Sequence, residues 1–147
     1  MKTEIETYCP DDTLDLGVRM GQEAKAGDVI TLIGDLGVGK TVFTKGFARG
    51  LGIREDVSSP TFTILQIYEG GRLPLYHFDV YRIGDSEEMF EVGWDDYIYG
   101  SGVCLIEWAD LIDDLVSEIP ADRLKKVTIE KKPEKGFDYR LITVDKG

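Results

Sequence analysis

The 147-residue chain has no asparagine, one histidine and two cysteines. Cys9 and Cys104 lie far apart and share that one histidine, so we expect neither a disulfide framework nor a zinc site. No stretch approaches the roughly 20 apolar residues that span a bilayer, and the first residues lack the apolar run of a secretion signal. We therefore expect a soluble cytoplasmic protein with no membrane partner.

Positive charge is also scarce. The chain has 17 Lys and Arg residues and 28 Asp and Glu residues, which gives a formal net charge of −11. Nucleic-acid binding normally uses many Lys and Arg contacts with phosphates, so this balance opposes DNA binding and any RNA role without a partner. The acidic residues are unevenly spread, with six acids and no base at residues 85–96. Such a run is typical of a solvated surface, and docking of a basic partner is the alternative.

The hydrophobic content of 42% and the length suit one compact domain, residues 1–147. Strand and helix patterns alternate without internal repeats, which predicts an α/β fold. The first expected helix has Leu14, Val18 and Ala24 roughly on one side, and Gly17 and Gly21 lie near this apolar stripe and allow close packing there. The first expected helix begins at Asp11 or Asp12 and runs to about Lys25, and the second runs from Lys40 to about Gly50. Three shorter helices are expected at residues 85–92, 94–99 and 109–118. The expected strands are 29–33, 61–68, 73–81, 103–108, 124–131 and 139–144, with hairpins joining the second to the third and the last two.

The segment GDLGVGKT matches the pattern G-x-x-x-x-G-K-[ST] between a buried strand and a helix, which is the context that confirms a P-loop. Backbone N–H groups of such a turn, together with the helix dipole, bind phosphates. Lys40 supplies a full positive charge to the β- and γ-phosphates, and the Thr41 hydroxyl ligates the magnesium that bridges them. We expect ATP with Mg2+ to bind and to be hydrolysed at the loop and the first helical turn, at Asp35, Leu36, Gly37, Val38, Gly39, Lys40, Thr41 and Val42.

A P-loop site also needs a carboxylate at the end of a neighbouring hydrophobic strand, to hold the magnesium directly or through water. Glu107 follows four apolar residues, which makes it a candidate metal ligand and catalytic residue; an ordinary strand-end acid is the alternative. The adjacent Trp108 is either a core ring or a ring that covers the nucleotide or a partner.

The segment HFDVYR alternates polar and apolar residues. In a strand this pattern puts His77, Asp79 and Tyr81 on one face and Phe78 and Val80 on the other. Asp79 is a candidate catalytic residue that orients the attacking water or binds magnesium through water. For His77 alone, a histidine hydrogen-bonded within the fold is the simpler interpretation.

Residues 59–61, Ser-Pro-Thr, follow the P-loop helix, where many P-loop enzymes have a switch that senses the γ-phosphate. Thr61 is therefore a candidate contact for magnesium or the γ-phosphate. A simple turn before a strand is the alternative.

In this order, GDLGVGKT, SPTFT, LYHFDVYR and CLIEW resemble the TsaE (formerly YjeE) family, P-loop ATPases of bacterial tRNA threonylcarbamoyladenosine biosynthesis. The resemblance covers nearly the whole chain. It implies a P-loop NTPase fold with a mixed sheet flanked by helices, and ATP hydrolysis that is weak alone and depends on the partners TsaB and TsaD. ATP turnover would reset the TsaB–TsaD complex between rounds of modification, and tRNA would be held through that complex.

The same resemblance implies that Thr41 and Glu107 bind magnesium, that Asp79 serves hydrolysis, and that residues 59–61 act as a switch. The terminal hairpin and the segment near residues 10–13 match least well. We expect the adenine between them, with Phe137 as a candidate stacking ring.

Three other functions compete with a partner-dependent ATPase. A GTPase needs an Asn-Lys-x-Asp-type segment to recognise guanine, and the chain has no asparagine. A kinase usually has an arginine-bearing lid over the phosphates, whereas the seven arginines here are scattered and no lid-like insertion is present. A nucleotide-gated binding module, in which hydrolysis is incidental, shares every ligand residue with the ATPase and remains the alternative.

Overall fold

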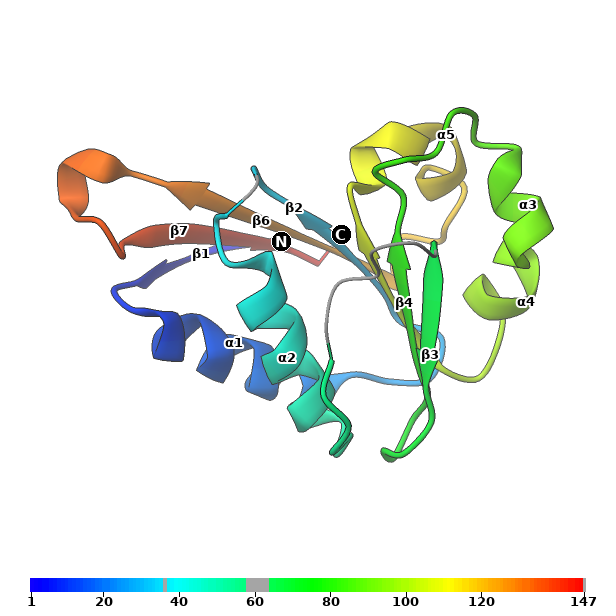
Figure 1. Cartoon of the computed structure of the whole chain (residues 1–147), viewed down its shortest axis with the longest axis horizontal. Coiled ribbons are helices and arrows are strands. Elements are labelled where there is room, and N and C mark those ends of the chain that lie inside the picture. Colours follow the sequence, from blue (N-terminus) through cyan, green and yellow to red (C-terminus); the bar gives the residue numbers. More distant parts are fainter. Residues whose placement is uncertain (36, 58–63, 147) are drawn as a thin grey trace.

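The computed structural model describes residues 1–35, 37–57 and 64–146 (Figure 1). The described strands are β1 (Lys2–Thr7), β2 (Val29–Ile33), β3 (Leu65–Tyr68), β4 (Leu75–Asp79), β5 (Val103–Glu107), β6 (Leu124–Lys131) and β7 (Arg140–Asp145). The described helices are α1 (Pro10–Glu23), α2 (Lys40–Gly50), α3 (Glu88–Val92), α4 (Trp94–Ile98) and α5 (Asp113–Val116), with 3-10 turns η1 (Ala109–Ile112) and η2 (Pro133–Lys135).

These strands form one seven-stranded sheet in the order β1-β7-β6-β2-β5-β4-β3. The central strand β2 pairs parallel with β5 and β6, and β5 pairs parallel with β4. The pairs β1–β7, β6–β7 and β3–β4 are antiparallel, so both predicted hairpins are present. The prediction of an α/β P-loop fold with a mixed sheet and a C-terminal hairpin is confirmed.

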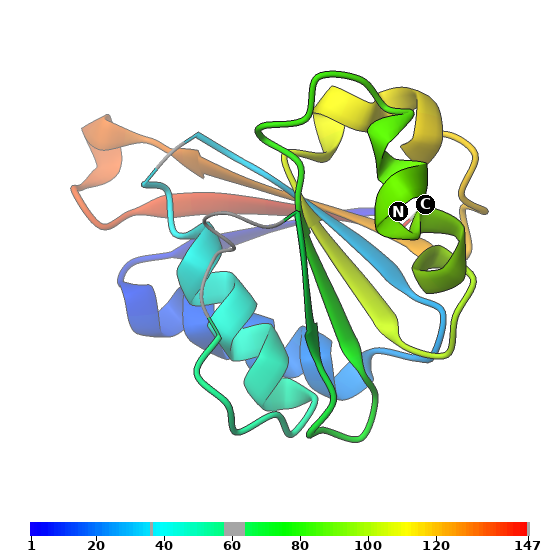
Figure 2. The ribbon, with the colours of Figure 1, turned by 45° about the vertical axis from the view of Figure 1, so that its right-hand side comes forward.

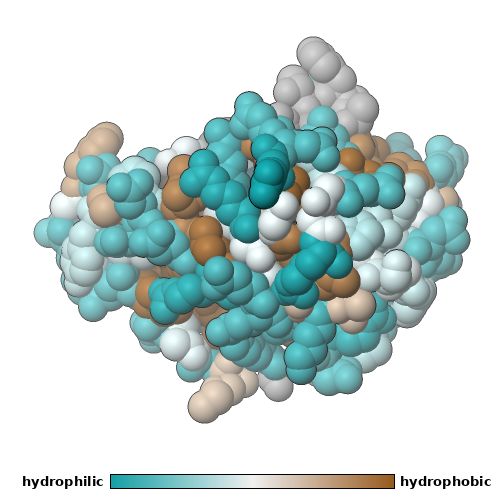
Figure 3. All heavy atoms as spheres, turned by 90° about the horizontal axis from the view of Figure 1, so that it is seen from below, coloured by the Kyte–Doolittle hydropathy of each residue, from teal (hydrophilic) through white to brown (hydrophobic). Residues whose placement is uncertain are grey.

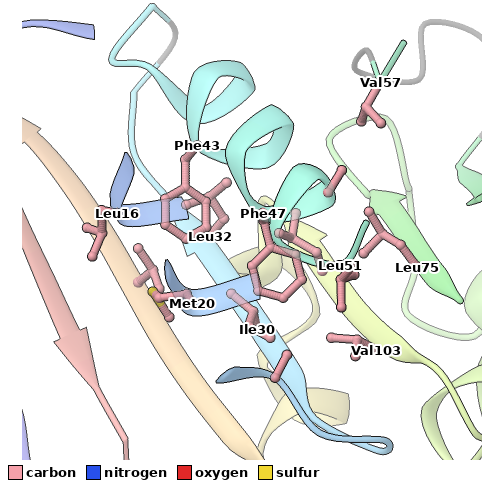
Figure 4. Close-up of a cluster of buried hydrophobic side chains, with 14 of the residues drawn as sticks. Leu16, Met20, Ile30, Leu32, Phe43, Phe47, Leu51, Val57, Leu75 and Val103 are labelled. Atoms are coloured by element: carbon pink, nitrogen blue, oxygen red, sulfur yellow. The ribbon is translucent and has the colours of Figure 1, made fainter. Parts of the chain in front are cut away.

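Helices cover both faces of the sheet (Figure 2). On one face α1 and α2 enclose a core in which Phe43 and Phe47, the predicted i,i+4 pair, are fully buried and stacked with ring centroids 6.3 Å apart. Both rings point from α2 toward the β2 side chains Ile30 and Leu32 (Figure 4). On the opposite face, α3, α4 and α5 lie over a second core that includes Phe78.

The outward side of α1 and α2 is mainly hydrophilic, with hydrophobic side chains showing between the polar ones (Figure 3). The large apolar side chains that these helices bury in the core over the sheet are Leu16, Met20, Phe43 and Phe47. Among the described residues, no helix combines the length and the apolar character needed to cross a membrane.

The helices α1 and α2 pack against each other backbone to backbone, through glycines spaced four residues apart on each helix. A Cβ added to Gly17, Gly21, Gly46 or Gly50 would overlap a carbonyl oxygen of the other helix, namely that of Phe43, Phe47, Leu14 or Val18 respectively. The close packing predicted at Gly17 and Gly21 is confirmed, and α2 supplies the matching glycines.

Several element predictions were wrong in detail. The strand β1 was not predicted, because its sequence KTEIET contains a single aliphatic residue and shows no apolar alternation. Of the predicted stripe, Ala24 is buried just after α1, but Leu14 and Val18 are half-buried, and the buried apolar side chains within α1 are Leu16 and Met20. The predicted helix 109–118 is a 3-10 turn followed by one short α-helix that ends at Val116. Residues 61–63 of the predicted strand 61–68 lie outside the described residues.

The helix contact predicts that Gly46→Ala destabilises the protein, although alanine is the better helix former by about 1 kcal/mol. The new methyl group would overlap the Leu14 carbonyl oxygen, and such overpacking costs about 1 to 3 kcal/mol or more. We expect urea unfolding to show a loss of about 2 kcal/mol for Gly46→Ala. In the control Gly70→Ala, the nearest atom lies 3.7 Å from the added Cβ, and a change within about 0.5 kcal/mol is expected. A Gly46→Ala protein as stable as the parent would contradict the packing.

Candidate phosphate and metal site

The candidate site lies where three parallel strands end at the same edge of the sheet. The strand β2 ends at Ile33 and leads through the loop 34–39 into α2. The strand β5 ends at Glu107 and β4 at Asp79, and these two residues are direct register partners. Glu107 is also the register partner of Leu32 in β2. Pairing alone therefore brings both predicted carboxylates beside the start of α2.

Glycines shape the loop that leads into α2. Gly37 and Gly39 have φ values of 79° and 112°, in the left-handed region that other residues rarely adopt, and Gly39 is the N-cap of α2. A Cβ at Gly34 would approach Val38 Cγ2 to 2.7 Å and the Ile129 carbonyl oxygen to 2.8 Å, so space also demands glycine there. The loop thus carries the backbone turn that a phosphate cradle requires.

Lys40 begins α2 and is buried, with 6% of its surface exposed. Its ammonium group donates to the Gly34 carbonyl oxygen at 2.7 Å and lies 3.7 Å from the centroid of the Trp108 ring. Burial lowers the pKa of Lys40 below its ordinary value, and the negative charges of Glu107 and Asp79 partly oppose this effect. The site thus holds a desolvated cation among acids.

Trp108 follows β5 with a φ of 64°, and it is the one non-glycine residue with positive φ in the described part of the chain. This conformation is costly for a bulky side chain and is typical of functional sites. Its half-buried ring covers the Lys40 ammonium, and the centroids of the Trp108 and Tyr81 rings lie 4.7 Å apart. The ring also packs against the second core, in line with the first of its two predicted environments, and its contact with a nucleotide or a partner stays a prediction.

The two carboxylates differ in environment. Glu107 is 3% exposed, and its Oε2 atom lies 2.7 Å from the His77 Nε2 atom. Asp79 is half-buried and accepts a hydrogen bond from the Tyr81 backbone N–H. Burial raises the pKa of Asp79, an effect that this hydrogen bond partly offsets and the Glu107 charge reinforces.

This donor set suits magnesium bound together with a substrate. Mg2+ prefers oxygen ligands and is usually held by one or two carboxylates plus substrate phosphates. The described residues contain no group of three or more His, Cys, Asp and Glu side chains that would hold a metal ion by themselves. The Thr41 hydroxyl lies at the exposed first turn of α2. Together with the Glu107 carboxylate it would therefore bind the ion only when phosphate oxygens complete the coordination shell of the magnesium.

The terminal hairpin borders the loop on its other side. Arg140 Nε donates to the Val38 carbonyl oxygen at 2.8 Å, and Arg140 Nη1 donates to the Phe137 and Tyr139 carbonyl oxygens at 2.9 and 2.7 Å. The guanidinium therefore joins the loop to the hairpin. The ring of Tyr139 also meets that of Tyr8 edge to face at 5.6 Å, next to the start of α1.

The structure brings together most of the predicted site residues. Lys40, Asp79 and Glu107 converge, and Asp35, Gly37, Val38, Gly39, Thr41 and Val42 form the loop and the first turn of α2. The ring of Phe137 is 91% exposed and points into solvent beside the hairpin tip. Leu36 and Thr61 lie outside the described residues.

Two interactions were missed in the sequence. Arg140 is 102 residues from Val38, and no local pattern signals their contact. The His77–Glu107 pair was within reach, because the alternation in HFDVYR placed His77 on the same face as Asp79. Phe78 and Val80 belong to the second core, as predicted for their face, whereas Tyr81 lies in a turn beyond the end of β4 and is not part of the strand face that carries His77 and Asp79.

The chain is similar to known proteins over most of its length. The family model described as "Threonylcarbamoyl adenosine biosynthesis protein TsaE" matches residues 7–140. A TsaE protein of Bacillus subtilis is 53% identical over 93% of this chain and 81% of its own length. A TsaE protein of Treponema pallidum is 48% identical over 74% of this chain and 78% of its own length. Both relatives are named as tRNA threonylcarbamoyladenosine biosynthesis proteins.

The fold matches a solved structure equally well. The crystal structure of YdiB from Bacillus subtilis superposes with a TM-score of 0.81 at 43% sequence identity, covering 100% of this chain and 87% of that one. The family match spans the loop, both carboxylates and Arg140. The chain belongs to the TsaE family of threonylcarbamoyl adenosine biosynthesis proteins.

Proposed function

We propose that this protein is the ATP-binding and ATP-hydrolysing subunit required for N6-threonylcarbamoyladenosine modification of tRNA. In this proposal it works in the cytoplasm with TsaB and TsaD, and ATP turnover resets their complex between rounds. The observation that supports it best is the convergence of Lys40, Asp79 and Glu107 at the start of α2. A cation, a helix N-terminus and two carboxylates at one point suit a magnesium nucleotide.

Phosphate binding falls to the loop and Lys40. The N–H groups at the start of α2 lack helical carbonyl partners, so phosphate oxygens can accept from them. Lys40 would exchange the Gly34 carbonyl and the Trp108 ring for the β- and γ-phosphates. Burial lowers the pKa of Lys40 in the free protein because it disfavours the charged form. Bound phosphate would place negative charge beside the ammonium group and so stabilise its charged form.

The carboxylates divide the remaining tasks. Thr41 and Glu107 would hold the magnesium, which when bound neutralises charge on the phosphates during transfer. Asp79 would orient the attacking water or accept its proton, and its raised pKa brings it closer to the pH range of a general base.

Weak turnover by the isolated subunit follows from the contacts of Lys40. The ammonium group is already engaged by a carbonyl oxygen and covered by the Trp108 ring, so nucleotide must displace both contacts. Binding of TsaB and TsaD that moves Trp108 away would lower this cost. The net charge of −11 supports the view that tRNA is held through the complex.

The first test is phosphate release from ATP by the chain alone and with TsaB and TsaD added. We expect stimulation by the partners in the parent protein and none in Lys40→Ala, which loses the phosphate-binding charge. Glu107→Gln and Asp79→Asn should reduce turnover by about 100-fold or more, while leaving ATP binding detectable. Turnover is measured by released phosphate and binding by calorimetry.

ATP binding without partner-stimulated hydrolysis would contradict the proposal. The nucleotide-gated binding module then becomes the better description. It predicts that a nonhydrolysable ATP analogue supports repeated rounds of tRNA modification as well as ATP does.

The Arg140 contact predicts a loss of nucleotide affinity when the loop is released. Arg140→Met removes a hydrogen bond from a charged donor to the Val38 carbonyl, worth about 1.5 to 3 kcal/mol. We expect the dissociation constant for MgATP to rise about tenfold or more. The control is Lys132→Met, on the same hairpin, where the lysine pairs with Glu130 at 3.6 Å, and its affinity should stay within about threefold of the parent. Equal effects of the two substitutions would show that charge alone, and not the loop contact, matters.

A further inference from the structure

His77 and Glu107 form the most deeply buried polar pair at the site. The imidazole is 0% exposed, the carboxylate is 3% exposed, and the Nε2 and Oε2 atoms lie 2.7 Å apart. A carboxylate oxygen only accepts hydrogen bonds, so Nε2 donates. Buried carboxylates rarely occur without such donors, and each bond that one receives restricts its orientation.

The pair connects two strands along a diagonal. The register partner of His77 in β5 is Leu105, and that of Asp79 is Glu107. The imidazole of His77 therefore bonds to a residue two positions beyond its direct partner, at the end of β5. It lies beneath the carboxylates, away from the open edge of the site. This places it behind Glu107 rather than among groups that face a nucleotide.

The position of this donor matters because Lys40 is close enough for the Glu107 charge to act on its pKa. A direct ion pair between them would occupy the phosphate-binding cation and the carboxylate at once. In the structure Glu107 is bonded to His77, while the Lys40 ammonium is bonded to the Gly34 carbonyl oxygen and covered by Trp108. The cation and the anion are therefore held by separate partners.

The other imidazole nitrogen, Nδ1, has no hydrogen-bond partner among the described residues. With Nε2 donating, the neutral ring leaves Nδ1 as an acceptor. A buried acceptor without a partner costs free energy. Leucine would avoid this cost but would take the Nε2 donor away from the buried Glu107 carboxylate, so the Nε2 bond is what the histidine contributes here.

We propose that His77 is a positioning residue that holds the Glu107 carboxylate toward the magnesium nucleotide and away from Lys40. This inference rests on the proposed function, because magnesium binding by Glu107 is part of that proposal. Partners behind metal-binding carboxylates typically contribute 10- to 100-fold in metal affinity or activity. His77 then sets how strongly magnesium enhances nucleotide binding, and it contributes little to binding without magnesium.

The test compares His77→Gln with His77→Asn. The glutamine amide nitrogen can reach the place of Nε2, whereas the shorter asparagine amide reaches only the place of Nδ1. Calorimetry with the nonhydrolysable analogue AMP-PNP gives dissociation constants in Mg2+ and in EDTA. We expect the magnesium enhancement to fall about tenfold or more in His77→Asn and to stay within about threefold in His77→Gln, with equal affinities in EDTA.

The outcomes separate this inference from the function on which it rests. Parent protein that shows no magnesium enhancement would overturn both. A His77→Asn variant with the full enhancement, or with affinity lost equally in EDTA, would overturn the positioning role alone.

A second measurement needs no substitution. Because His77 is the single histidine in the chain, its ring nitrogens can be assigned directly by NMR of tag-free, 15N-labelled protein. We expect a proton on Nε2 both in free protein and with Mg2+ and AMP-PNP. A ring protonated on Nδ1 alone would overturn the proposal, because it could not donate to Glu107.

Discussion

Parallel pairing of β2, β5 and β4 is the constraint on which the site depends. Strands that run in the same direction end at the same edge, so Glu107 and Asp79 arrive beside the loop after β2 without any contribution from the loops. The helix α2 then starts at that edge, with its partial positive charge directed at the same point. Every later detail, including the burial of Lys40 and the His77–Glu107 bond, follows from this alignment.

The site also keeps opposite charges separate in a region of low solvent access. Lys40 and Glu107 are both buried, and attraction between such charges grows as water is removed. Their hydrogen bonds go to a carbonyl oxygen and an imidazole instead. The ring of Trp108 shields the cation, at the cost of an unfavourable backbone conformation. Such an arrangement is more suited to accepting a charged ligand than to maximal stability.

The sequence predicted what periodicity and local motifs encode. The strand β2, the glycine-rich loop, α2 and the strand-end position of Glu107 all have local patterns, whereas the mixed sheet was expected only from the family resemblance. The polar edge strand β1 had no such pattern, because only Ile5 among its residues is aliphatic. The contact of Arg140 with Val38 and the left-handed backbone of Trp108 depend on tertiary packing, which no window of neighbouring residues reveals.

The glycines between α1 and α2 have a consequence for how the protein folds. Each glycine in a helix interior weakens that helix by about 1 kcal/mol relative to alanine, and both helices carry two at the contact. Neither segment is then a strong helix by itself, and isolated helices of this length are marginal in water. Helical structure in α1 and α2 should therefore arise together, when their backbones meet over the sheet. The phosphate-binding end of α2 would then become ordered together with α1.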